Sequence, residues 1–597
     1  MTRLVNDPHA FAGEALAGFA AVHEDRVTPV GGGVVRAGGT PRGQVAVVLG
    51  GGSGHYPAFA GWVGPGFAHG AACGNTFASP SAGQIRSVAR AAENGAGVLF
   101  GFGNYAGDVM QFGLAAERLR AEGIDARTLP VTDDVASAPL AERHLRRGVG
   151  GDLLVFKIAC AAAEAGLGLN AVEAVARRAN EATRSLGIAF GGCTLPGAER
   201  PLFTVARGQM AIGLGIHGEP GLRTTGLPAA DEVADLLVSQ ILDDLGPRAD
   251  DGSRVAVLVN GLGATKHEEL FVVYGRIAHR LRAAGLTPVL PEVSEQVTSL
   301  DMAGLSLSLT VLDDELEKHW SAPADAPAFR RTVPEPGRTR RVAPAPALPE
   351  HASSPVSPAS ADSRAAVPHA VRAFTTTSRV LAGHEERLGA VDAVAGDGDH
   401  GIGMARGSAA AARAAGDAAA GGAGVRGVLL HAADAWAEAA GGSSGALWGA
   451  ALTAAAGVLG DEHAPRAQDV VRAARASLDA LVGLGGARVG DKTMVDAVSP
   501  FVDALDAAVS DGADLRRAWS LAARAAAEAA ERTADLTARL GRARAHGAAS
   551  LGTPDAGALS FALIVEALAT TEPGTGSASL PRPTAAPSRL TSSEEHA

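Results

Sequence analysis

The pattern of the chain changes once, over Ser321–Ala366, and this change constrains the fold more than any other feature of the sequence. Periodic apolar residues give way there to Pro, Ala, Ser and Arg, as in Pro334-Glu335-Pro336. A segment without an apolar face has no surface to bury, so we interpret residues 326–366 as a semi-extended Pro/Ala-rich linker. Because 597 residues are too many for one hydrophobic core, the sequence predicts a domain on each side, at residues 1–325 and 367–572.

Residues 1–325 alternate short β-rich runs with helical stretches, which is the pattern of an α/β domain. The predicted strands are Gln44–Leu49, Val98–Phe100, Leu153–Phe156, Phe203–Val205, Val255–Val259 and Leu307–Val311. Loops with polar groups lie at residues 50–55, 103–108 and 213–221. Ligands of open α/β sheets collect at strand ends, so we expect these loops to form a binding site.

Beyond the linker, alanine becomes abundant and the strand signals end. Apolar residues from Leu515 to Ala526 keep a 4-3-4 spacing, and similar helical faces recur at 428–439, 446–459 and 558–569. The sequence therefore predicts an all-helical second domain. Residues 573–597 are rich in Pro, Ser and Thr, and we interpret them as a disordered tail.

Composition disfavours several classes of function. The net charge of −12 opposes nucleic-acid binding, which normally needs a basic surface. No uninterrupted apolar run approaches the roughly 18 residues of a membrane span, and Met1–Pro8 lacks the apolar core of a signal peptide. The three cysteines have no C-x-x-C spacing, which argues against a disulfide framework or a cysteine zinc site. We therefore expect a cytoplasmic protein with no membrane partner.

Three carboxylates lie within eight residues, at Asp392, Asp397 and Asp399. Interspersed glycines disfavour a regular helix there, so the sequence predicts a tight loop. Mg²⁺ binds a few carboxylates and completes its shell with water and substrate phosphate. The loop is therefore a candidate nucleotide-metal site. A solvated acidic turn is the alternative that these three residues alone leave open.

Two glycine motifs suggest nucleotide folds that their contexts oppose. Gly213–Gly218 satisfies G-x-G-x-x-G, but Glu219-Pro220-Gly221 follows and does not open the helix that would hold a pyrophosphate. Gly485–Thr493 looks like a P-loop with one residue inserted, but no predicted strand precedes it and Asp491 would put a carboxylate where phosphate should lie. Both a Rossmann site and a Walker-type NTPase are therefore disfavoured.

Four glycine-bearing loops punctuate the helical domain instead, at residues 396–403, 441–445, 485–493 and 552–557. If the helices run up and down, such loops can meet at one end of the domain. Backbone amides of these loops, together with carboxylate-bound Mg²⁺, are then suited to hold a nucleotide.

At this point the ordered motifs resemble those of the dihydroxyacetone kinases, in the form that joins both domains in one chain. The resemblance covers roughly residues 1–325 and 370–570. Its markers are Gly50–Pro57, Asn104–Asp108, Gly215–Gly221, Thr298–Met302, Gly396–Gly401, Gly441–Gly445, Gly490–Met494 and Gly541-Arg542. The resemblance implies a dimeric α/β ketose-binding domain and an ATP-binding barrel of eight helices.

The resemblance also implies a role for each matching residue. His217 matches the histidine that bonds covalently to the substrate ketone, and His55 and Asp108 match the acid–base pair beside it. The implied ketose-binding residues are Gly52, Ser53, Gly54, His55, Gly103, Asp108 and His217. The implied Mg²⁺ ligands are Asp392, Asp397 and Asp399. The implied ATP-binding residues are His400, Gly401, Ile402, Gly403, Ser443, Ser444, Gly485, Met494, Arg542, Asp555, Ala556 and Gly557.

One position departs from the family pattern. Members specific for dihydroxyacetone have Lys-Asn-Tyr where this chain has Gly103-Asn104-Tyr105. Loss of the lysine removes a hydrogen-bond donor and opens space, so the chain looks like relatives that phosphorylate the four-carbon ketose erythrulose. The prediction is an ATP- and Mg²⁺-dependent kinase for erythrulose, dihydroxyacetone or both, acting as a homodimer.

Two other classes of function remain as alternatives. A ketose-sensing regulator would bind the sugar without transferring phosphate, but the complete set of Asp392, Asp397 and Asp399 favours catalysis. A transferase that takes phosphate from a carrier phosphoprotein is disfavoured because the nucleotide loops and the metal site share one chain with the ketose domain.

Overall fold

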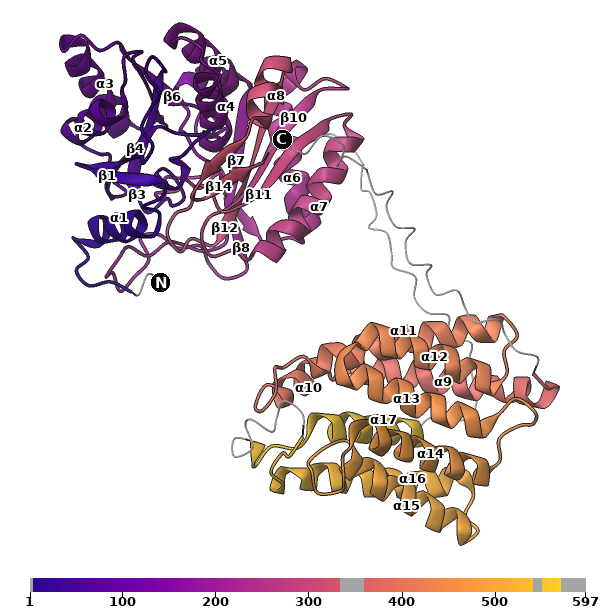
Figure 1. Cartoon of the computed structure of the whole chain (residues 1–597). Coiled ribbons are helices and arrows are strands. Elements are labelled where there is room, and N and C mark those ends of the chain that lie inside the picture. Colours follow the sequence, from indigo (N-terminus) through magenta and orange to yellow (C-terminus); the bar gives the residue numbers. More distant parts are fainter. Residues whose placement is uncertain (1–3, 333–358, 541–549, 571–597) are drawn as a thin grey trace, which may run out of the picture. The chain divides into compact units, whose positions relative to one another are not determined.

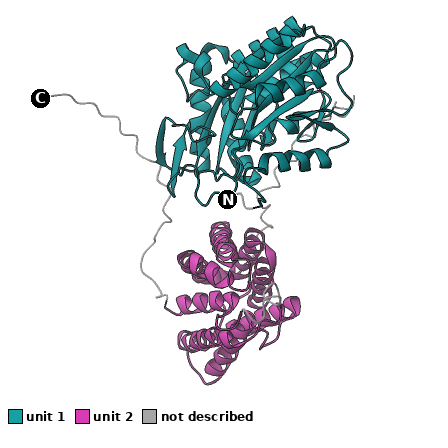
Figure 2. Ribbon diagram, turned by 90° about the vertical axis from the view of Figure 1, so that its left-hand side faces the viewer, with its two compact units in different colours: residues 1–341 teal, residues 342–597 magenta. Residues whose placement is uncertain are grey.

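The computed structural model of the protein describes residues 4–332, 359–540 and 550–570. The chain forms two compact units that divide after residue 341, each with its own core (Figure 2). The strand β14 (Phe329–Arg331) is the last element described in the first unit, and the helix α9 (Ala361–Gly383) is the first in the second unit. Both elements lie partly or wholly within residues 326–366, the range interpreted above as a linker.

The first unit contains two six-stranded sheets (Figure 1). The first sheet consists of β1 (Val27–Val30), β2 (Gly33–Arg36), β3 (Ala46–Ser53), β4 (Gly70–Thr76), β5 (Val98–Gly103) and β6 (Ala126–Val131). Its strand order is β1-β2-β4-β3-β5-β6, in which β3 runs parallel to β4 and β5, and β5 parallel to β6. The loops after β3 and β5 therefore lie at the same edge, where ligands of parallel sheets bind.

The second sheet consists of β7 (Thr183–Ala189), β8 (Gln209–Ile212), β9 (Arg223–Gly226), β10 (Arg254–Gly261), β11 (Thr287–Ser294) and β12 (Gly304–Leu312). Its order is β11-β10-β12-β7-β8-β9, and every pair is antiparallel except β10 with β11. A small hairpin pairs β13 (Ala324–Ala326) with β14. The helices of the unit are α1 (Phe11–Val22), α2 (Ala82–Ala92), α3 (Ala106–Ala121), α4 (Asp152–Glu164), α5 (Leu169–Ala182), α6 (Ala230–Leu245), α7 (His267–Ala283) and α8 (Asp314–Ser321).

Helices cover both faces of each sheet, which explains the continuous apolar runs in the strands. In β3, Val47 and Leu49 pack in the core that contains α4, whereas Ala46 and Val48 pack in the core of α2 and α3. The strand β10 divides its side chains in the same way, between the core of α4 and α5 and that of α6 and α7. The unit is thus a stack of alternating helical and sheet layers with α4 at its centre (Figure 1).

Four of the six predicted strands are confirmed, within β3, β5, β10 and β12, and two are wrong. Leu153–Phe156 lies in α4, where all four side chains are fully buried. A short apolar run of this kind does not distinguish a buried strand from a helix that is buried on every side. Phe203–Val205 lies in the irregular segment that leads to β8.

The second unit is all-helical throughout the residues that the structure describes, as the sequence predicts. Its helices are α9, α10 (Glu385–Asp392), α11 (His400–Ala420), α12 (Val425–Ala440), α13 (Gly442–Leu459), α14 (Ala467–Gly485), α15 (Val495–Ser510), α16 (Leu515–Arg532) and α17 (Ala556–Thr570). The helix α9 packs on α11, and each helix from α10 to α16 packs on the one that follows it. The ring closes where α17 packs on α9 (Figure 1). The ring encloses an apolar cavity of about 740 Å³.

Among the described helices, only α13 is long and apolar enough to cross a membrane, with a mean hydropathy of 1.2. It packs between α12 and α14 in the ring, and Trp448, Leu452 and Leu459 line the enclosed cavity. The ring thus accounts for its apolar character.

Candidate active site

The loop after β3 carries His55 into the interior of the first unit. Gly54 adopts a φ of +100°, in the left-handed region that favours glycine. The His55 side chain is only 4% exposed, and its ring stacks on Phe77 with the centroids 4.9 Å apart. Its Nδ1 lies 2.7 Å from the carbonyl oxygen of Thr298. Because a carbonyl only accepts, Nδ1 carries the proton and Nε2 presents a lone pair.

The loop after β8 carries His217, which Glu219 holds from two sides. The Glu219 carboxylate accepts the backbone N–H of His217, and its Oε1 lies 3.0 Å from His217 Nδ1. Although burial opposes it, the hydrogen bond and charge of His217 lower the pKa of Glu219 to about 2. Glu219 is therefore an ionised acceptor, which places the proton of a neutral His217 on Nδ1 and leaves Nε2 as a nucleophile.

The Nε2 atoms of His55 and His217 face each other at 3.0 Å. Burial first, and then the neighbouring His217, lower the pKa of His55 to about 3. With both Nδ1 atoms committed to acceptors, two neutral rings turn lone pairs toward each other, so a hydrogen bond between them requires an added proton. This arrangement suits an electrophile such as a carbonyl carbon, which His217 Nε2 can attack.

Asp108 and Gly103 complete the sequence-predicted group around His217. Asp108 lies in the first turn of α3, is 7% exposed, and has an Oδ1 atom that is buried without a hydrogen-bond partner. Burial is the main cause that raises the pKa of Asp108 to about 6, although Ser79 and His217 oppose it. Gly103 is the last residue of β5, and the ring of Tyr105 lies next to it, 5.0 Å from the ring of His217.

The glycines at the end of β3 let the chain approach its neighbours closely. A Cβ atom on Gly52 would lie 2.8 Å from the backbone nitrogen of Ala78. Ser53 donates its hydroxyl to the carbonyl oxygen of Gly74 at 2.7 Å, so in this structure its side chain is used to fix the loop.

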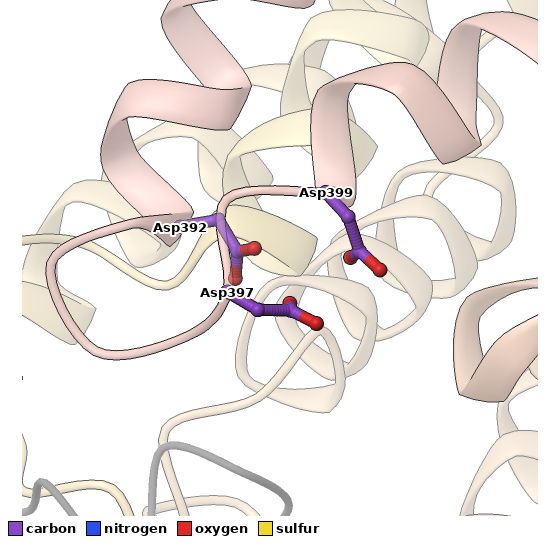
Figure 3. A group of neighbouring side chains, drawn as sticks. All are labelled: Asp392, Asp397 and Asp399. Carbon is purple, nitrogen blue, oxygen red and sulfur yellow. The ribbon is translucent and has the colours of Figure 1, made fainter. Parts of the chain in front are cut away.

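In the second unit, Asp392, Asp397 and Asp399 converge on one point (Figure 3). Asp392 ends α10, Asp399 precedes α11, and each of the three can offer an oxygen within 4.8 Å of the others. Carboxylate oxygens at this spacing fit a hard divalent cation such as Mg²⁺. The half-buried Asp392 and the two exposed aspartates leave one side open for water and phosphate ligands.

Loops distant in sequence meet beside these carboxylates. His400 Nε2 lies 3.0 Å from the hydroxyl of Ser560 in α17, and Nδ1 lies 3.5 Å from that of Ser444 in α13. A small cavity of about 40 Å³ is lined by both Asp392 and Asp555. Burial, and then nearby Asp496, raise the pKa of Asp555 to about 6, although its hydrogen bond from the Ala558 N–H opposes the shift.

The remaining predicted ATP residues lie around the same loops. A Cβ atom on Gly557 would lie 3.3 Å from Cβ of Met494, so these two loops touch, and Ala556 lines the small cavity. Gly401 and Gly403 lie in the first turn of α11, whereas Ile402 and Ser443 are exposed. Gly485 ends α14 against Leu447 of α13. Arg542 lies outside the described residues.

The elements around the two glycine motifs are not those of a Rossmann site or a Walker-type NTPase. Gly213–Gly218 is followed by the strand β9, not by a helix. Gly485–Thr493 joins the helices α14 and α15, so the element directly before it is a helix and not a strand. The sequence analysis missed Glu219 and Lys492 as site residues. An acidic residue two positions after His217 was the available signal for Glu219, whereas the partners of Lys492 are carbonyls 44 to 61 residues away.

Comparison with known proteins assigns the two units. The chain matches the Dak1 domain over residues 17–328 and the DAK2 domain over residues 394–570. An L-erythrulose 1-kinase of Mycolicibacterium smegmatis is 57% identical over 571 residues, covering 95% of this chain and 99% of the relative. A D-erythrulose kinase of the same species is 52% identical over 578 residues, covering 95% and 98%.

A solved structure covers the same two domains. The dihydroxyacetone kinase of C. freundii, in complex with AMP-PNP and Mg²⁺, is 30% identical with a TM-score of 0.56, covering 95% of this chain and 99% of that one. The matched part of the chain includes residues of both units. The chain therefore belongs to the family of single-chain dihydroxyacetone kinases, in which a Dak1 domain is followed by a DAK2 domain.

Proposed function

We propose that the protein is an ATP- and Mg²⁺-dependent kinase that phosphorylates a terminal hydroxyl of a short-chain ketose, using erythrulose at least as well as dihydroxyacetone. The observation that carries the proposal is the His217 ring, which Glu219 fixes with Nε2 as a nucleophile facing His55 at 3.0 Å. Identities of 52–57% to erythrulose kinases over nearly the whole chain support the substrate class.

The first step is addition of the ketone to His217. The Nε2 lone pair forms a bond to the carbonyl carbon, the π electrons move to the oxygen, and the oxygen takes up a proton from solvent. The Glu219 carboxylate offsets the positive charge on the ring, and His55 Nε2 accepts a hydrogen bond from the new hydroxyl. Because Nε2 has no second proton to lose, the hemiaminal does not proceed to an imine and remains reversible. Glycerol lacks a carbonyl, so this step excludes it.

The second step is transfer of the γ-phosphoryl group to a terminal hydroxyl of the held ketose. Asp108 is the group suited to take the hydroxyl proton, because a general base works best when its pKa lies near the working pH. Asp392, Asp397 and Asp399 would hold Mg²⁺, which neutralises phosphate charge when bound. His400, Ser444 and the loop of Asp555 would line the ATP site beside them.

A regulator that only senses ketose is the alternative function. It is less well supported, because a sensing role does not require the complete carboxylate cluster or the loops gathered around His400. We also propose that the enzyme works in the cytoplasm as a homodimer, as the family resemblance implies.

Substrate assays with the full-length protein test the proposal. Purified protein is incubated with ATP and Mg²⁺ and either enantiomer of erythrulose, dihydroxyacetone or glycerol, and the product is identified by ³¹P NMR. We expect a sugar phosphate from the ketoses, formation that stops when Mg²⁺ is chelated, and no product from glycerol. Binding of ketose without any phosphorylated product would favour the regulator instead.

A further inference from the structure

Arg147 is a largely buried cation beside the ketose site that the proposed mechanism leaves unused. It lies in the segment between β6 and α4, and its side chain is 12% exposed. Its Nη1 lies 3.8 Å from Glu219 Oε2, which is an ion-pair distance but too long for a hydrogen bond. The other carboxylate oxygen, Glu219 Oε1, lies 3.0 Å from His217 Nδ1. Arg147 therefore contacts the residue that fixes the nucleophile.

The same guanidinium group also contacts the start of the loop that carries His217. Arg147 Nη2 donates to the carbonyl oxygen of Gly213, directly after β8, at 3.2 Å. Gly213 and Glu219 lie on opposite sides of His217 in the sequence. One side chain from a distant segment thus contacts the loop both before and after the histidine.

Asp134 holds Arg147 in place. The Asp134 Oδ2 atom accepts a hydrogen bond from Arg147 Nε at 2.9 Å and lies 2.7 Å from Nη2. The main chains are joined as well, because the N–H of Asp134 donates to the carbonyl oxygen of Arg147 at 3.1 Å. Nε and Nη2 are therefore used for Asp134 and Gly213, and Nη1 faces Glu219.

Gly215 leaves the space in which the two charged groups meet. A Cβ atom on Gly215 would clash with Glu219 Oε2 and would lie 2.5 Å from Arg147 Nη1. Any other residue at this position would push the two groups apart. The contact thus depends on a glycine of the His217 loop, which is not expected if Arg147 served only as a partner for Asp134.

Both members of the pair are ionised. Although burial opposes it, neighbouring groups, with Asp134 first among them and Glu219 included, raise the pKa of Arg147 above its usual value. The pKa of Glu219 is lowered to about 2, as described above. Because Arg147 is shielded from water, attraction between these charges is stronger than at the protein surface.

We propose that Arg147 is a positioning residue that holds Glu219 against His217 and thereby keeps Nε2 of His217 available to attack the ketone. The inference rests on the proposed function and adds one residue to the anchors of the nucleophile. The tautomer of a neutral histidine is set by the hydrogen bond at its other ring nitrogen. If Glu219 turned away, the proton would be able to move to Nε2, which would then have no lone pair to offer. Arg147 acts through Glu219 and not on the ketose itself.

A double-mutant cycle between Arg147 and Glu219 tests this inference. Arg147→Met removes the guanidinium group, and Glu219→Gln removes the carboxylate charge at nearly constant size. We expect Arg147→Met to lower kcat/KM for the ketose by about 10–100-fold, with KM for ATP unchanged, and to add little to the loss in the Glu219→Gln enzyme. Arg118→Met, at an exposed position of α3, is the matched control and should keep the wild-type rates.

The tautomer of His217 gives a second readout, which needs no substrate. In ¹⁵N NMR of the full-length protein labelled in histidine, we expect His217 to be protonated on Nδ1 in the wild type and partly on Nε2 in Arg147→Met. Arg147→Lys keeps a cation for Asp134 but has only one charged nitrogen, so it cannot make all the contacts of the guanidinium. We therefore expect Arg147→Lys to keep the wild-type Tm and still lower kcat/KM, and it replaces Arg147→Met in the cycle if that variant does not fold.

The inference is overturned if the losses of the two single variants multiply in the double variant, because Arg147 then acts independently of Glu219. It is also overturned if the His217 tautomer is the same in the folded Arg147 variant as in the wild type. Failure of the proposed function has a different signature, since the wild type would then phosphorylate no ketose. The tautomer measurement would still report whether Arg147 holds Glu219 against His217.

Discussion

At the scale of single residues, the proposed chemistry depends on how the protein fixes protons on two histidines. Thr298 fixes His55 through a carbonyl, and Glu219 fixes His217 through a carboxylate. Neither anchor takes part in bond formation, yet together they leave both Nε2 atoms as acceptors at 3.0 Å. The nucleophilic nitrogen of His217 is therefore set by its neighbours and not by the histidine alone.

The pH dependence of turnover should report Asp108. Its pKa is raised to about 6 in the free protein, so the base form grows as pH rises through that value. We expect kcat/KM for the ketose, measured at saturating ATP, to rise with pH up to about 6 and then level off. Asp108→Asn should remove this acid limb and lower the plateau by about 10²–10⁴-fold.

Asp555 provides the control for this assignment, because its pKa is also raised to about 6 but it lies in the helical unit. An acid limb caused by Asp555 would appear in kcat/KM for ATP. If the limb for the ketose survives in Asp108→Asn, Asp108 is not the base.

Gly103 should set the size of the ketose. Its backbone is outside the left-handed region, so a side chain is allowed, although its Cβ atom would lie 3.2 Å from the Gly148 carbonyl oxygen. We expect Gly103→Lys to fill the space beside His217 and to shift the ratio of kcat/KM toward dihydroxyacetone by about 10–200-fold. Gly113→Lys is a matched control, since Gly113 in α3 has open space around it. An unchanged ratio in a folded Gly103→Lys enzyme would remove this position as a determinant.

At the scale of helices and strands, the loops that carry the candidate ketose site follow β3, β5 and β8, at strand ends as the sequence analysis expects. The loops after β3 and β5 were predictable because an apolar run leads directly into glycines and polar residues. The helix α4 was not predictable from the sequence, because it is buried on every side. It has no polar face, so its residues do not alternate between apolar and polar with the helical period.

In the helical unit, the carboxylate cluster was predictable because its three members are close in sequence. The contacts of Lys492 were not predictable from the sequence, because its hydrogen-bond partners lie in a distant loop. Lys492 Nζ donates to the carbonyl oxygens of Leu536, Ser550 and Thr553, at 2.5–3.0 Å. One buried ammonium therefore ties the segment before α17 to the segment before α15.

Lys492→Met should remove these three hydrogen bonds and destabilise the contact between the two segments. Three carbonyl oxygens lose a charged donor, so the free energy of unfolding of the helical unit should fall by about 3 kcal/mol. The Asp555 loop joins the same segment, so KM for ATP should rise while KM for the ketose stays near the wild-type value. Calorimetry and initial rates measure both effects, with the exposed Lys318→Met as control. Equal changes in both KM values would contradict a local role.

At the scale of the whole molecule, the proposed function divides the two halves of the reaction between separate units. The histidine pair lies in the α/β unit, and the carboxylate cluster lies in the helical unit, each supported by its own core. Changes to one half of the chemistry should therefore leave binding in the other unit intact.

Asp397→Asn and Asp399→Asn test this division. Each variant removes a charge from the candidate metal site, so ATP-dependent turnover should fall by roughly a hundredfold or more, because a bound metal ion contributes several kcal/mol to the transition state. Ketose binding, measured by calorimetry in the absence of ATP, should stay unchanged. Asp479→Asn, on the exposed face of α14, is the matched control. Full turnover in either cluster variant would disprove the metal assignment.

The central claim is that His217 holds the ketose as a covalent adduct while a hydroxyl of the same molecule receives phosphate. The most direct measurement is ¹³C NMR of the full-length protein with a ketose labelled at its carbonyl carbon. The account predicts that the bound carbon changes from trigonal to tetrahedral in the wild type, and that this signal is absent in His217→Ala. A bound ketose whose carbon stays trigonal, or an adduct signal that persists in His217→Ala, would contradict it.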